Sequence, residues 1–258
     1  MFLELEPLDL WVKLLSPEWR ESIEASTDVS ALVIPELHII LALRWEHGKA
    51  FIGGGIVAEY YNCTNCGILT YLVVHKKSRG QGLAGILVSR AVEVMGKNAK
   101  KRGKLAGCNA VLLETNSAEK VTPQQDVMCV FKWYGILPRA FADMTYRDPR
   151  MRHVIYHKMG FRLIDHPYIM PPLAPGKGKL KILLLTVYIT PNIPRDPFRA
   201  NKFYLPNQLL ENFIAGQWKG AHAKGNLGCP PEQDPDYTRS IGLIDIREKI
   251  PLLDLPCA

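Results

Sequence analysis

The chain has 258 residues, of which 47% are hydrophobic and 22% are charged. These values lie close to the average for globular proteins, so they exclude a disordered chain and predict one domain with additions or two small domains. No apolar run approaches the roughly 20 residues that cross a bilayer, and the acidic start "MFLELEPLDL" lacks the cationic and apolar parts of a secretion signal. We therefore expect a cytoplasmic protein with no membrane partner.

The formal net charge of +7 is concentrated in one short segment. Between His75 and Lys104, nine Lys or Arg stand against a single acid, Glu93, so this segment carries +8 and the rest of the chain carries −1. The cations at residues 100–102 also fit an ordinary helix end, where they complement the helix dipole. Those at the start of the segment fit that explanation less well. One short basic element favours a compact anionic ligand over a nucleic acid.

The first half of the chain predicts strands and helices in alternation. Hydrophobic periodicity and cap residues indicate a strand over residues 2–8, helices over 9–16 and 17–26, three strands between 37 and 75, a helix from Gly82 to about Arg102, and a strand over Ala110–Asn116. The turn-like sequences "EHGK" and "NCTNCG" separate the three central strands. This order is typical of a protein in which helices cover a sheet.

The second half is less regular. A long insertion, residues 117–150, is followed by a helix over 151–160 and by strands over 162–173 and 180–190. Ordinary connections are about 4 to 6 residues long, so an insertion of this length is expected to shape a binding site. The last 68 residues hold nine of the nineteen prolines. We therefore predict a main domain over residues 1–190 and, over 191–258, an irregular proline-rich extension that packs on it.

The six cysteines are scattered, and only Cys63 and Cys66 form a CxxC pair. A zinc site needs a second pair or nearby histidines, and neither follows. The pair is therefore expected to be reduced, structural thiols in a hairpin loop, as is usual in the cytosol. We predict no metal.

The stretch "YLVVHKKSRGQGLAGIL", residues 71–87, runs from a strand through a cationic turn into a helix. Unpaired amides at a helix start face outward and the helix dipole favours an anion there, while Gly80 and Gly82 let a ligand approach the backbone. The stretch lacks the Lys-Ser/Thr pair of a P-loop and the three spaced glycines of a dinucleotide fold. It is therefore a candidate phosphate-binding turn of another kind, or an ordinary connection.

This stretch resembles the acetyl-coenzyme A binding motif of the GNAT superfamily of N-acetyltransferases, R/Q-x-x-G-x-G/A, through Arg79, Gly82 and Ala84. Further along, "YHKMGF" at residues 156–161 resembles the Tyr, Gly and Phe that close the fourth helix of that family. The order of predicted elements over roughly residues 1–190 also agrees. The resemblance implies an α/β (α+β) GNAT fold, with a mixed central sheet of about seven strands and flanking helices.

The resemblance also implies which residues hold acetyl-coenzyme A or another acyl-coenzyme A. The backbone of Val73 and Val74 would pair with the pantetheine arm where two central strands separate. The pyrophosphate would meet the amides of the turn, that is Arg79, Gly80, Gln81, Gly82, Leu83 and Ala84. Asn116 stands where the family often places a polar residue against pantetheine, although a turn residue after a strand is an equal alternative.

Acyl transfer to an amine needs a group that removes a proton from the amine and one that protonates the departing thiolate. By resemblance, Tyr156 would give that proton to the coenzyme A sulfur, and the amide of Val74 would stabilise the oxyanion. The family often carries a glutamate base on its fourth strand, but "GILTYLVVH" has no carboxylate. Glu59 on the preceding strand is the preferred substitute and Glu114 the second choice, and either could be a solvated strand residue.

The resulting prediction is an acetyl- or acyl-coenzyme A dependent N-acyltransferase of the EC 2.3.1 type. Its acceptor would be an amine of a small molecule, because aromatic residues in the insertion and the proline-rich extension could roof the site. The alternatives are transfer of a longer acyl chain, a non-catalytic GNAT-like module that binds coenzyme A or a protein, and, least favoured, a nucleic-acid binder. The protein would be a monomer or a homodimer.

Overall fold

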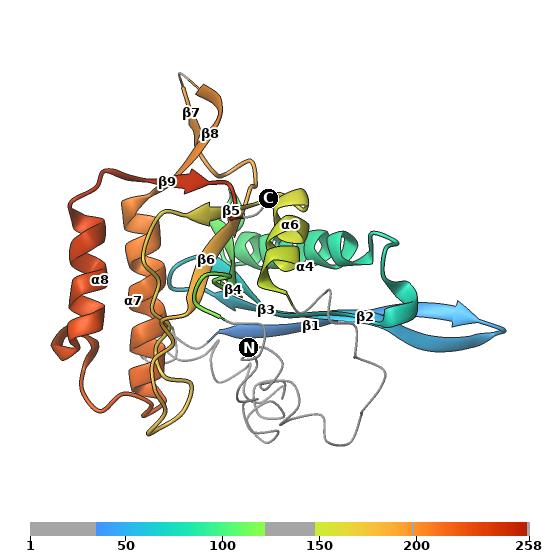
Figure 1. The fold of residues 1–258 in the computed structure, drawn as a ribbon, viewed down its shortest axis with the longest axis horizontal. Coiled ribbons are helices and arrows are strands. Elements are labelled where there is room, and N and C mark those ends of the chain that lie inside the picture. The colour runs from blue at the N-terminus through green and yellow to red at the C-terminus, as the bar shows by residue number, and fades with distance from the viewer. Residues whose placement is uncertain (1–34, 122–147, 198, 257–258) are drawn as a thin grey trace.

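The computed structural model describes residues 35–121, 148–197 and 199–256 (Figure 1). The predicted strand over residues 2–8, the two helices that follow it and most of the insertion lie outside the described residues. The described strands are β1 (Glu36–Glu46), β2 (Lys49–Tyr61), β3 (Cys66–Val74), β4 (Ala110–Asn116), β5 (Phe161–Ile164), β6 (Leu183–Tyr188), β7 (Arg195–Asp196), β8 (Arg199–Pro206) and β9 (Lys249–Leu253). The described helices are α4 (Leu83–Lys101), α6 (Pro149–Lys158), α7 (Asn207–Ala223) and α8 (Pro235–Asp245), with short 3-10 turns η1 (Lys76–Ser78) and η3 (Pro231–Gln233).

All nine described strands join one mixed sheet in the order β1-β2-β3-β4-β6-β5-β9-β8-β7. The strands from β1 to β3 form an antiparallel meander, and α4 then crosses over so that β4 pairs with β3 in parallel. The other neighbouring described strands are antiparallel. The predicted mixed α+β fold is confirmed, and the six predicted strands that fall within the described residues are all present.

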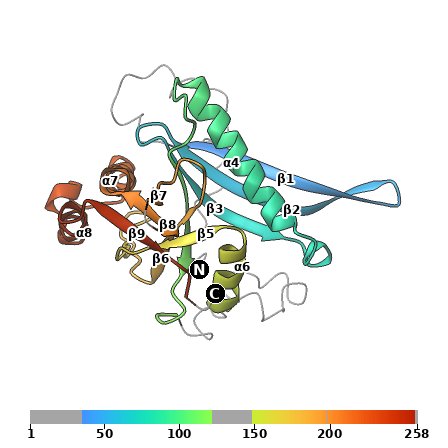
Figure 2. The same ribbon diagram turned by 90° about the horizontal axis from the view of Figure 1, so that it is seen from above.

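The helix after the cationic turn forms because its apolar residues share one face. Leu87, Val88, Ala91, Met95 and Ala99 are buried at helical spacing, and they pack on the face of the sheet that carries Leu69, Val111 and Leu113. Figure 2 shows α4 lying across β1 to β3. The helix therefore holds its own first turn against the sheet next to the end of β3.

Three consecutive glycines in β2 let the start of α4 come this close. A Cβ on Gly54 would lie 2.8 Å from the carbonyl oxygen of Val73 and 3.3 Å from Cδ1 of Leu87. A contact below 3.0 Å with the backbone would force the strands or the helix apart. Gly54 therefore positions both the end of β3 and the first turn of α4.

The segment after residue 190 was predicted to be irregular, and this prediction is wrong. It contains the helices α7 and α8 and the strands β7 to β9 (Figure 1). With these three strands the described sheet has nine strands instead of about seven. Several prolines of this segment stand at the boundaries of its elements, although Pro251 lies inside β9. Pro206 precedes α7, and Pro235 is the first residue of α8 behind the capping side chain of Asp234. A proline is tolerated at a helix start, where its missing N–H is not needed. Proline content alone therefore hid two regular helices.

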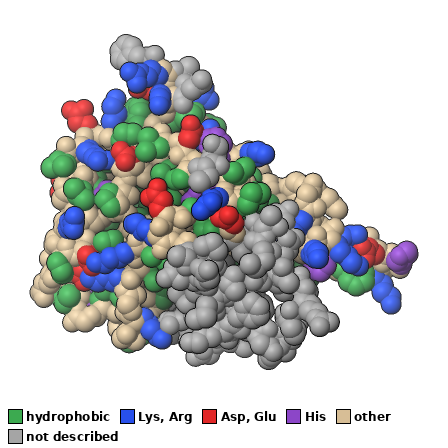
Figure 3. All heavy atoms as spheres, in the orientation of Figure 1, with side chains coloured by type: hydrophobic (Ala, Val, Ile, Leu, Met, Phe, Trp, Pro, Cys, Tyr) green, Lys and Arg blue, Asp and Glu red, His purple; other side chains and the backbone are tan. Residues whose placement is uncertain are grey.

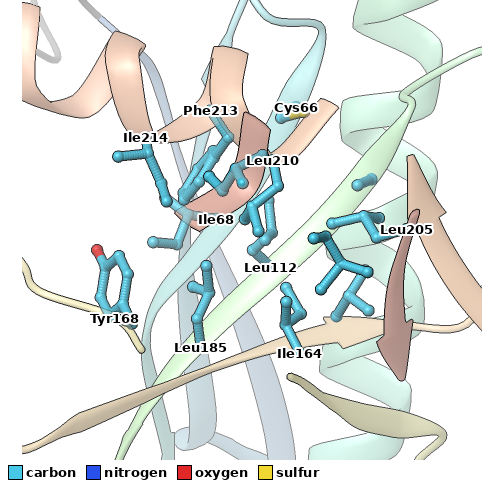
Figure 4. Close-up of a cluster of buried hydrophobic side chains, with 14 of the residues drawn as sticks. Cys66, Ile68, Leu112, Ile164, Tyr168, Leu185, Leu205, Leu210, Phe213 and Ile214 are labelled. Atoms are coloured by element: carbon cyan, nitrogen blue, oxygen red, sulfur yellow. The ribbon is translucent and has the colours of Figure 1, made fainter. Parts of the chain in front are cut away.

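Two clusters of buried apolar side chains lie on opposite faces of the sheet. Alternate residues of each central strand divide between them, with Ile68 and Leu112 on one face and Leu69 and Leu113 on the other. On the first face α7 covers the sheet through Leu210, Phe213, Ile214 and Trp218, as Figure 4 shows for the first three. Residues after 190 therefore share a core with β3, β4 and β6. The domain boundary at residue 190 stays a prediction.

Candidate functional site

The parallel strands β3 and β4 pair only over their first halves. Cys66 to Leu69 pair with Ala110 to Leu113, but β3 continues to Val74 and β4 to Asn116. Beyond Leu69 this edge of β3 has no strand partner among the described residues. Polar backbone groups at such an edge can take an extended ligand as an additional strand would.

A cavity of about 540 Å³ lies where the two strands part. Its lining includes Thr70 from β3, Glu59 from β2, Glu114 and Asn116 from β4, and Tyr156 from α6. The structure therefore brings together four residues that the sequence singles out from positions almost 100 residues apart. The volume falls within the about 300 to 1,000 Å³ of small-molecule sites.

Two threonines in this cavity have hydroxyl groups that the protein does not use. Oγ1 of Thr70 and Oγ1 of Thr115 are buried and have no hydrogen-bond partner within the described chain. Buried polar atoms are nearly always paired, so such atoms in a cavity point to a bound ligand or water. The sequence analysis did not single out either residue.

The cationic turn has the geometry of an anion site. His75 accepts a hydrogen bond at Nδ1 from the amide of Lys77 and so starts η1. Gly80 and Gly82 follow in the left-handed region at φ 74° and 75°, where a Cβ would meet nothing within 4 Å. Such a backbone favours glycine and turns successive amides toward one side.

The first amides of α4 point outward without a cap. The described chain offers no side-chain cap at Gly82, and its amides at residues 80–85 have no backbone acceptor. The first bond of the helix runs from the amide of Ile86 to the carbonyl of Gly82, at 3.2 Å. A shallow hollow lies beside it, lined by Gly82, Gly85, Ile86, Ser89, Arg90 and Glu93, the last two of which form an ion pair. Free amides, the helix dipole and the exposed Lys76 and Lys77 together suit a phosphate group.

Two predicted residues of the turn also have structural contacts. Nε of Arg79 donates to the carbonyl of Val74 at 3.2 Å, which ties the turn to the end of β3. Gln81 donates through Nε2 to the carbonyl of Lys77 at 3.2 Å. The side chain of Val73 is half exposed. None of the residues from Val73 to Ala84 lines the main cavity, which extends along β3 only to Leu72. The structure thus places the turn and the cavity at successive points along one strand.

Tyr156 reaches the cavity from the face of the sheet that α4 and α6 cover. Its ring packs edge-on against Phe161 with the ring centroids 5.9 Å apart, and burial raises the pKa of its phenol. The described residues give its hydroxyl no hydrogen-bond partner. The hydroxyl is therefore held in place by packing while its proton remains available to a ligand.

A fully buried histidine anchors α6 at this position. Nε2 of His153 lies 2.9 Å from the carbonyl oxygen of Asn116, and Nδ1 lies 3.1 Å from that of Pro256. Burial lowers the pKa of His153, so the neutral form is favoured. The contact fixes α6 to the end of β4, and therefore fixes Tyr156 relative to Asn116.

Glu59 and Glu114 enter the cavity from the opposite face of the sheet. Across the sheet, Glu59 of β2 lies opposite Ile68 of β3, and Ile68 lies opposite Leu112 of β4. Glu114 follows Leu112 by two residues on the same strand. Side chains alternate along a strand, so both carboxylates lie on the face that α7 covers. Tyr61 donates a hydrogen bond to Glu59 at 2.7 Å. The cavity therefore joins a phenol on one face to a carboxylate pair on the other.

Glu114 is half-buried, as Glu59 is, but its carboxyl group lies in a less polar setting. Burial raises the pKa of its carboxyl to about 7, and the nearby charge of Glu59 acts in the same direction. The hydroxyl of Tyr168 donates to Oε1 of Glu114 and lies 2.6 Å from Oε1 of Gln217. Hydrogen bonds from Tyr168 and Gln217 oppose the rise in pKa. A carboxyl with a pKa near neutrality is suited to accept a proton at the pH of a cell.

Sequence reasoning missed Tyr168 and Gln217. Tyr168 falls in a stretch predicted to be a strand, but β5 ends at Ile164 and Tyr168 lies in the segment that leads to β6. Gln217 lies on α7, in the part of the chain predicted to be irregular. The sequence "NQLLENFIAGQW", residues 207–218, is a helical hint within that segment, but no local signal pairs Gln217 with Glu114.

The described residues form neither a cluster suited to a metal ion nor a helix suited to a membrane. Among the described residues no group of three or more His, Cys, Asp or Glu side chains could hold a metal ion. In that same part of the chain Cys63 is exposed and Cys66 and Cys108 are buried, all as free thiols. No described helix combines the length and the apolar character needed to cross a membrane.

Comparison with known proteins bears on the turn and the central strands. The sequence model of the family described as "Acetyltransferase (GNAT) family" matches residues 8–118. No curated protein matches the chain at a significant level. The match includes β1 to β4, the cationic turn and α4, and so covers one side of the cavity.

Several solved structures are similar to this chain. The NatC complex bound to Gag peptide and CoA has 18% identity and a TM-score of 0.36, over 72% of this chain and 82% of that one. A Bacillus subtilis acetyltransferase in complex with CoA has 15% identity and a TM-score of 0.31, over 72% and 95%. Tetrahymena GCN5 has 10% identity and a TM-score of 0.31, over 70% and 88%.

TM-scores this low carry no argument about the function of this chain. The relation to acetyltransferases rests on the match of the family model and on the cationic turn. The matched residues 8–118 include Arg79, Gly82 and Ala84, and the structure gives this turn outward-facing amides at the start of a helix. Residues 8–118 of the chain, which include the cationic turn and α4, match the acetyltransferase (GNAT) family.

Proposed function

We propose that the protein is an N-acetyltransferase that transfers the acetyl group of acetyl-coenzyme A to an amine of a small molecule. The observation that carries this proposal is the single cavity at the parting of β3 and β4, which joins Tyr156 on one face of the sheet to Glu59 and Glu114 on the other. A thioester held along the edge of β3 would reach this point from the cationic turn.

The coenzyme would bind mainly to the backbone. The amides of residues 80–85 would hold the pyrophosphate, with Lys76 and Lys77 beside the remaining phosphate. The free edge of β3 at Val73 and Val74 would pair with pantetheine, and Asn116 together with the unpartnered hydroxyl of Thr70 would meet its amides. Arg79 and Gln81 would act indirectly, because each stabilises the turn through a backbone carbonyl.

Glu114 would be the general base, with Glu59 beside it, which reverses the order of preference that the sequence suggested. Its pKa of about 7 allows it to take a proton from an ammonium group and leave a neutral amine. The amine nitrogen would then bond to the acetyl carbon while the bond from that carbon to sulfur breaks, and the second proton lost by the nitrogen would restore the phenol of Tyr156 after it has protonated the sulfur. Tyr156 would give its proton to the departing thiolate, and the amide of Val74 would stabilise the oxyanion.

A small acceptor is supported by the size of the cavity. On the carboxylate side its lining comes from α7 and from the segment between Met170 and Leu180. The cavity volume, about 540 Å³, suits a metabolite. Whether the protein acts as a monomer or a homodimer does not enter this proposal.

The experiment is a calorimetric titration with acetyl-coenzyme A and with desulfo-coenzyme A. We expect micromolar binding by the natural protein and its loss in Gly82→Trp, where a bulky side chain would cover the amides of the turn. Gly48→Trp is the matched control, because Gly48 has φ 76° and no atom within 4 Å of its missing Cβ, but lies at the tip of the β1–β2 hairpin. No binding by the natural protein would refute the proposal.

Acceptors are then sought by mass spectrometry of products from a panel of amines. An increase of one acetyl group on a small amine, abolished in Glu114→Gln, supports the assignment. Coenzyme binding without transfer to any amine or peptide would instead favour a non-catalytic module. Transfer only from long-chain thioesters would replace acetyl by a longer acyl group.

A further inference from the structure

The carboxyl group of Glu114 is held by two side chains that come from distant parts of the chain. Tyr168, which is 4% exposed, donates from the segment between β5 and β6. Gln217 approaches from α7, with its Oε1 2.6 Å from the hydroxyl of Tyr168. The phenol has one proton, so Gln217 cannot share it with Glu114. The amide of Gln217 therefore contributes its N–H side to the cluster, with oxygen and nitrogen exchanged where needed.

Packing leaves these two side chains little freedom. Tyr168 belongs to the apolar cluster under α7, together with Ile214 of that helix (Figure 4). Gln217 sits one turn further along α7, next to the fully buried Trp218. Side chains fixed by a packed core hold a functional group with the precision that catalysis needs. The hydroxyl of Tyr168 is accordingly a fixed donor and not a rotating one.

We propose, on the basis of the function proposed above, that Tyr168 and Gln217 are positioning residues that hold the ionised carboxylate of Glu114 in place for the acceptor amine. The segment after residue 190 is then part of the catalytic machinery, because α7 supplies one of the two holding groups. Neither residue touches the reacting atoms. Each acts through Glu114.

Other charged and titratable groups line the same cavity. They are Glu59 and Tyr61 from β2, Tyr71 from β3, Arg152 and Tyr156 from α6, Lys177 and Lys179 from the segment before β6, and Lys224 after α7. Lys179 is already bound by Asp234 at 2.7 Å and by Asp236 at 2.9 Å. The groups that act on the pKa of Glu114 are Glu59, which raises it, and Tyr168 and Gln217, which lower it. Substituting Glu59 and substituting Tyr168 or Gln217 should therefore shift the pKa of Glu114 in opposite directions, and each shift can be measured separately.

The experiment is the pH dependence of kcat/KM in three variants. Tyr168→Phe removes a hydrogen bond to the charged form of Glu114, so the acid limb of the profile should move to higher pH by about one unit. Gln217→Leu should move it in the same direction by less. Glu59→Gln removes a neighbouring negative charge, so the limb should move to lower pH.

Tyr237→Phe serves as the matched control. Tyr237 is a buried tyrosine that also packs against α7, with its ring centroid 5.6 Å from that of Trp218, but it does not line the cavity. We expect its profile to match that of the natural protein. A purely structural role for Tyr168 would lower activity in both tyrosine variants and leave the acid limb in place, and that result would overturn the proposal.

Infrared titration of the carboxyl group keeps the test independent of turnover. The band of a protonated carboxyl that disappears in Glu114→Gln identifies this residue, and its midpoint should shift in the same directions as the kinetic limb. These shifts without any acetyl transfer would mean that the cluster holds Glu114 but the proposed function is wrong. Unchanged midpoints in both Tyr168→Phe and Gln217→Leu would refute the inference while leaving the acetyltransferase proposal intact.

Discussion

The two halves of the candidate site are built in different ways. The cofactor half is backbone, with amides and left-handed glycines from residues 75–86 in one continuous stretch. The proposed acceptor half is made of side chains, since Glu59, Glu114 and Gln217 come from three elements and Tyr168 from a connecting segment, spread over more than 150 residues. A continuous backbone site depends on local rules of turn and helix formation. An assembled side-chain site exists only after the whole sheet has formed.

The largest expected effect is the loss of turnover in Glu114→Gln without a loss of coenzyme binding. Glu114→Gln keeps the shape of the side chain but removes the base, so kcat should fall about 100-fold to 10,000-fold. Binding of acetyl-coenzyme A should be unchanged, because the turn does not contact Glu114. Steady-state kinetics with calorimetry on the same preparation measures both. An equal loss of binding would mean that the halves are not separable.

The same substitution has a second consequence, in stability. The pKa of Glu114 is raised in the folded protein from an ordinary 4.5 to about 7, so folding favours its protonated form. The natural protein should therefore be most stable, relative to Glu114→Gln, below pH 4.5, and this advantage should be lost as pH rises to about 7. Between pH 4.5 and pH 8 the natural protein should lose about 3 kcal/mol of stability relative to the variant. Urea unfolding at pH 5 and pH 8 measures the difference, and equal values at both would argue against a less polar setting for this carboxyl group.

The close packing of β2 against the end of β3 and the start of α4, which positions the proposed cofactor half, can be tested at Gly54. A methyl group there would lie 2.8 Å from the carbonyl of Val73, so Gly54→Ala should lower the free energy of unfolding by about 2 kcal/mol. Affinity for the coenzyme should fall with it, because the end of β3 and the first turn of α4 would shift. Gly48→Ala in the hairpin turn is the control for lost stability without a clash, because it strains a left-handed residue where a Cβ meets no atom within 4 Å. Tight coenzyme binding by Gly54→Ala would show that the turn is held by other contacts.

The smallest effect is expected from the exposed cations. Lys76→Gln with Lys77→Gln should weaken coenzyme binding only about threefold to tenfold, since exposed charges are well screened. The difference from the natural protein should shrink as salt is added. Titration at two ionic strengths measures it. A loss as large as that of Gly82→Trp would mean that charge, and not the backbone amides, dominates this half.

The contrast also explains how much could be predicted from the sequence. The strands from residue 36 to 74, the turn and α4 follow from alternation, glycine placement and helical spacing, and all were predicted within a few residues. Glu59 and Glu114 were named as candidates, but the less polar setting that distinguishes Glu114 depends on α7. That helix was hidden because prolines suggested irregular structure, whereas several of them stand at element boundaries.

Pairing of β9 with β5 has a consequence for how the protein is made on the ribosome. Leu163 lies opposite Leu253, so the sheet gains a strand from residues that are synthesised about 90 positions later. The core under α7 likewise waits for Trp218 to cover Ile68 and Leu112. Contacts of such sequence separation form slowly and leave apolar surface exposed in the growing chain. The cofactor turn can form early in synthesis, whereas Glu114 gains its less polar environment only after α7 has left the ribosome.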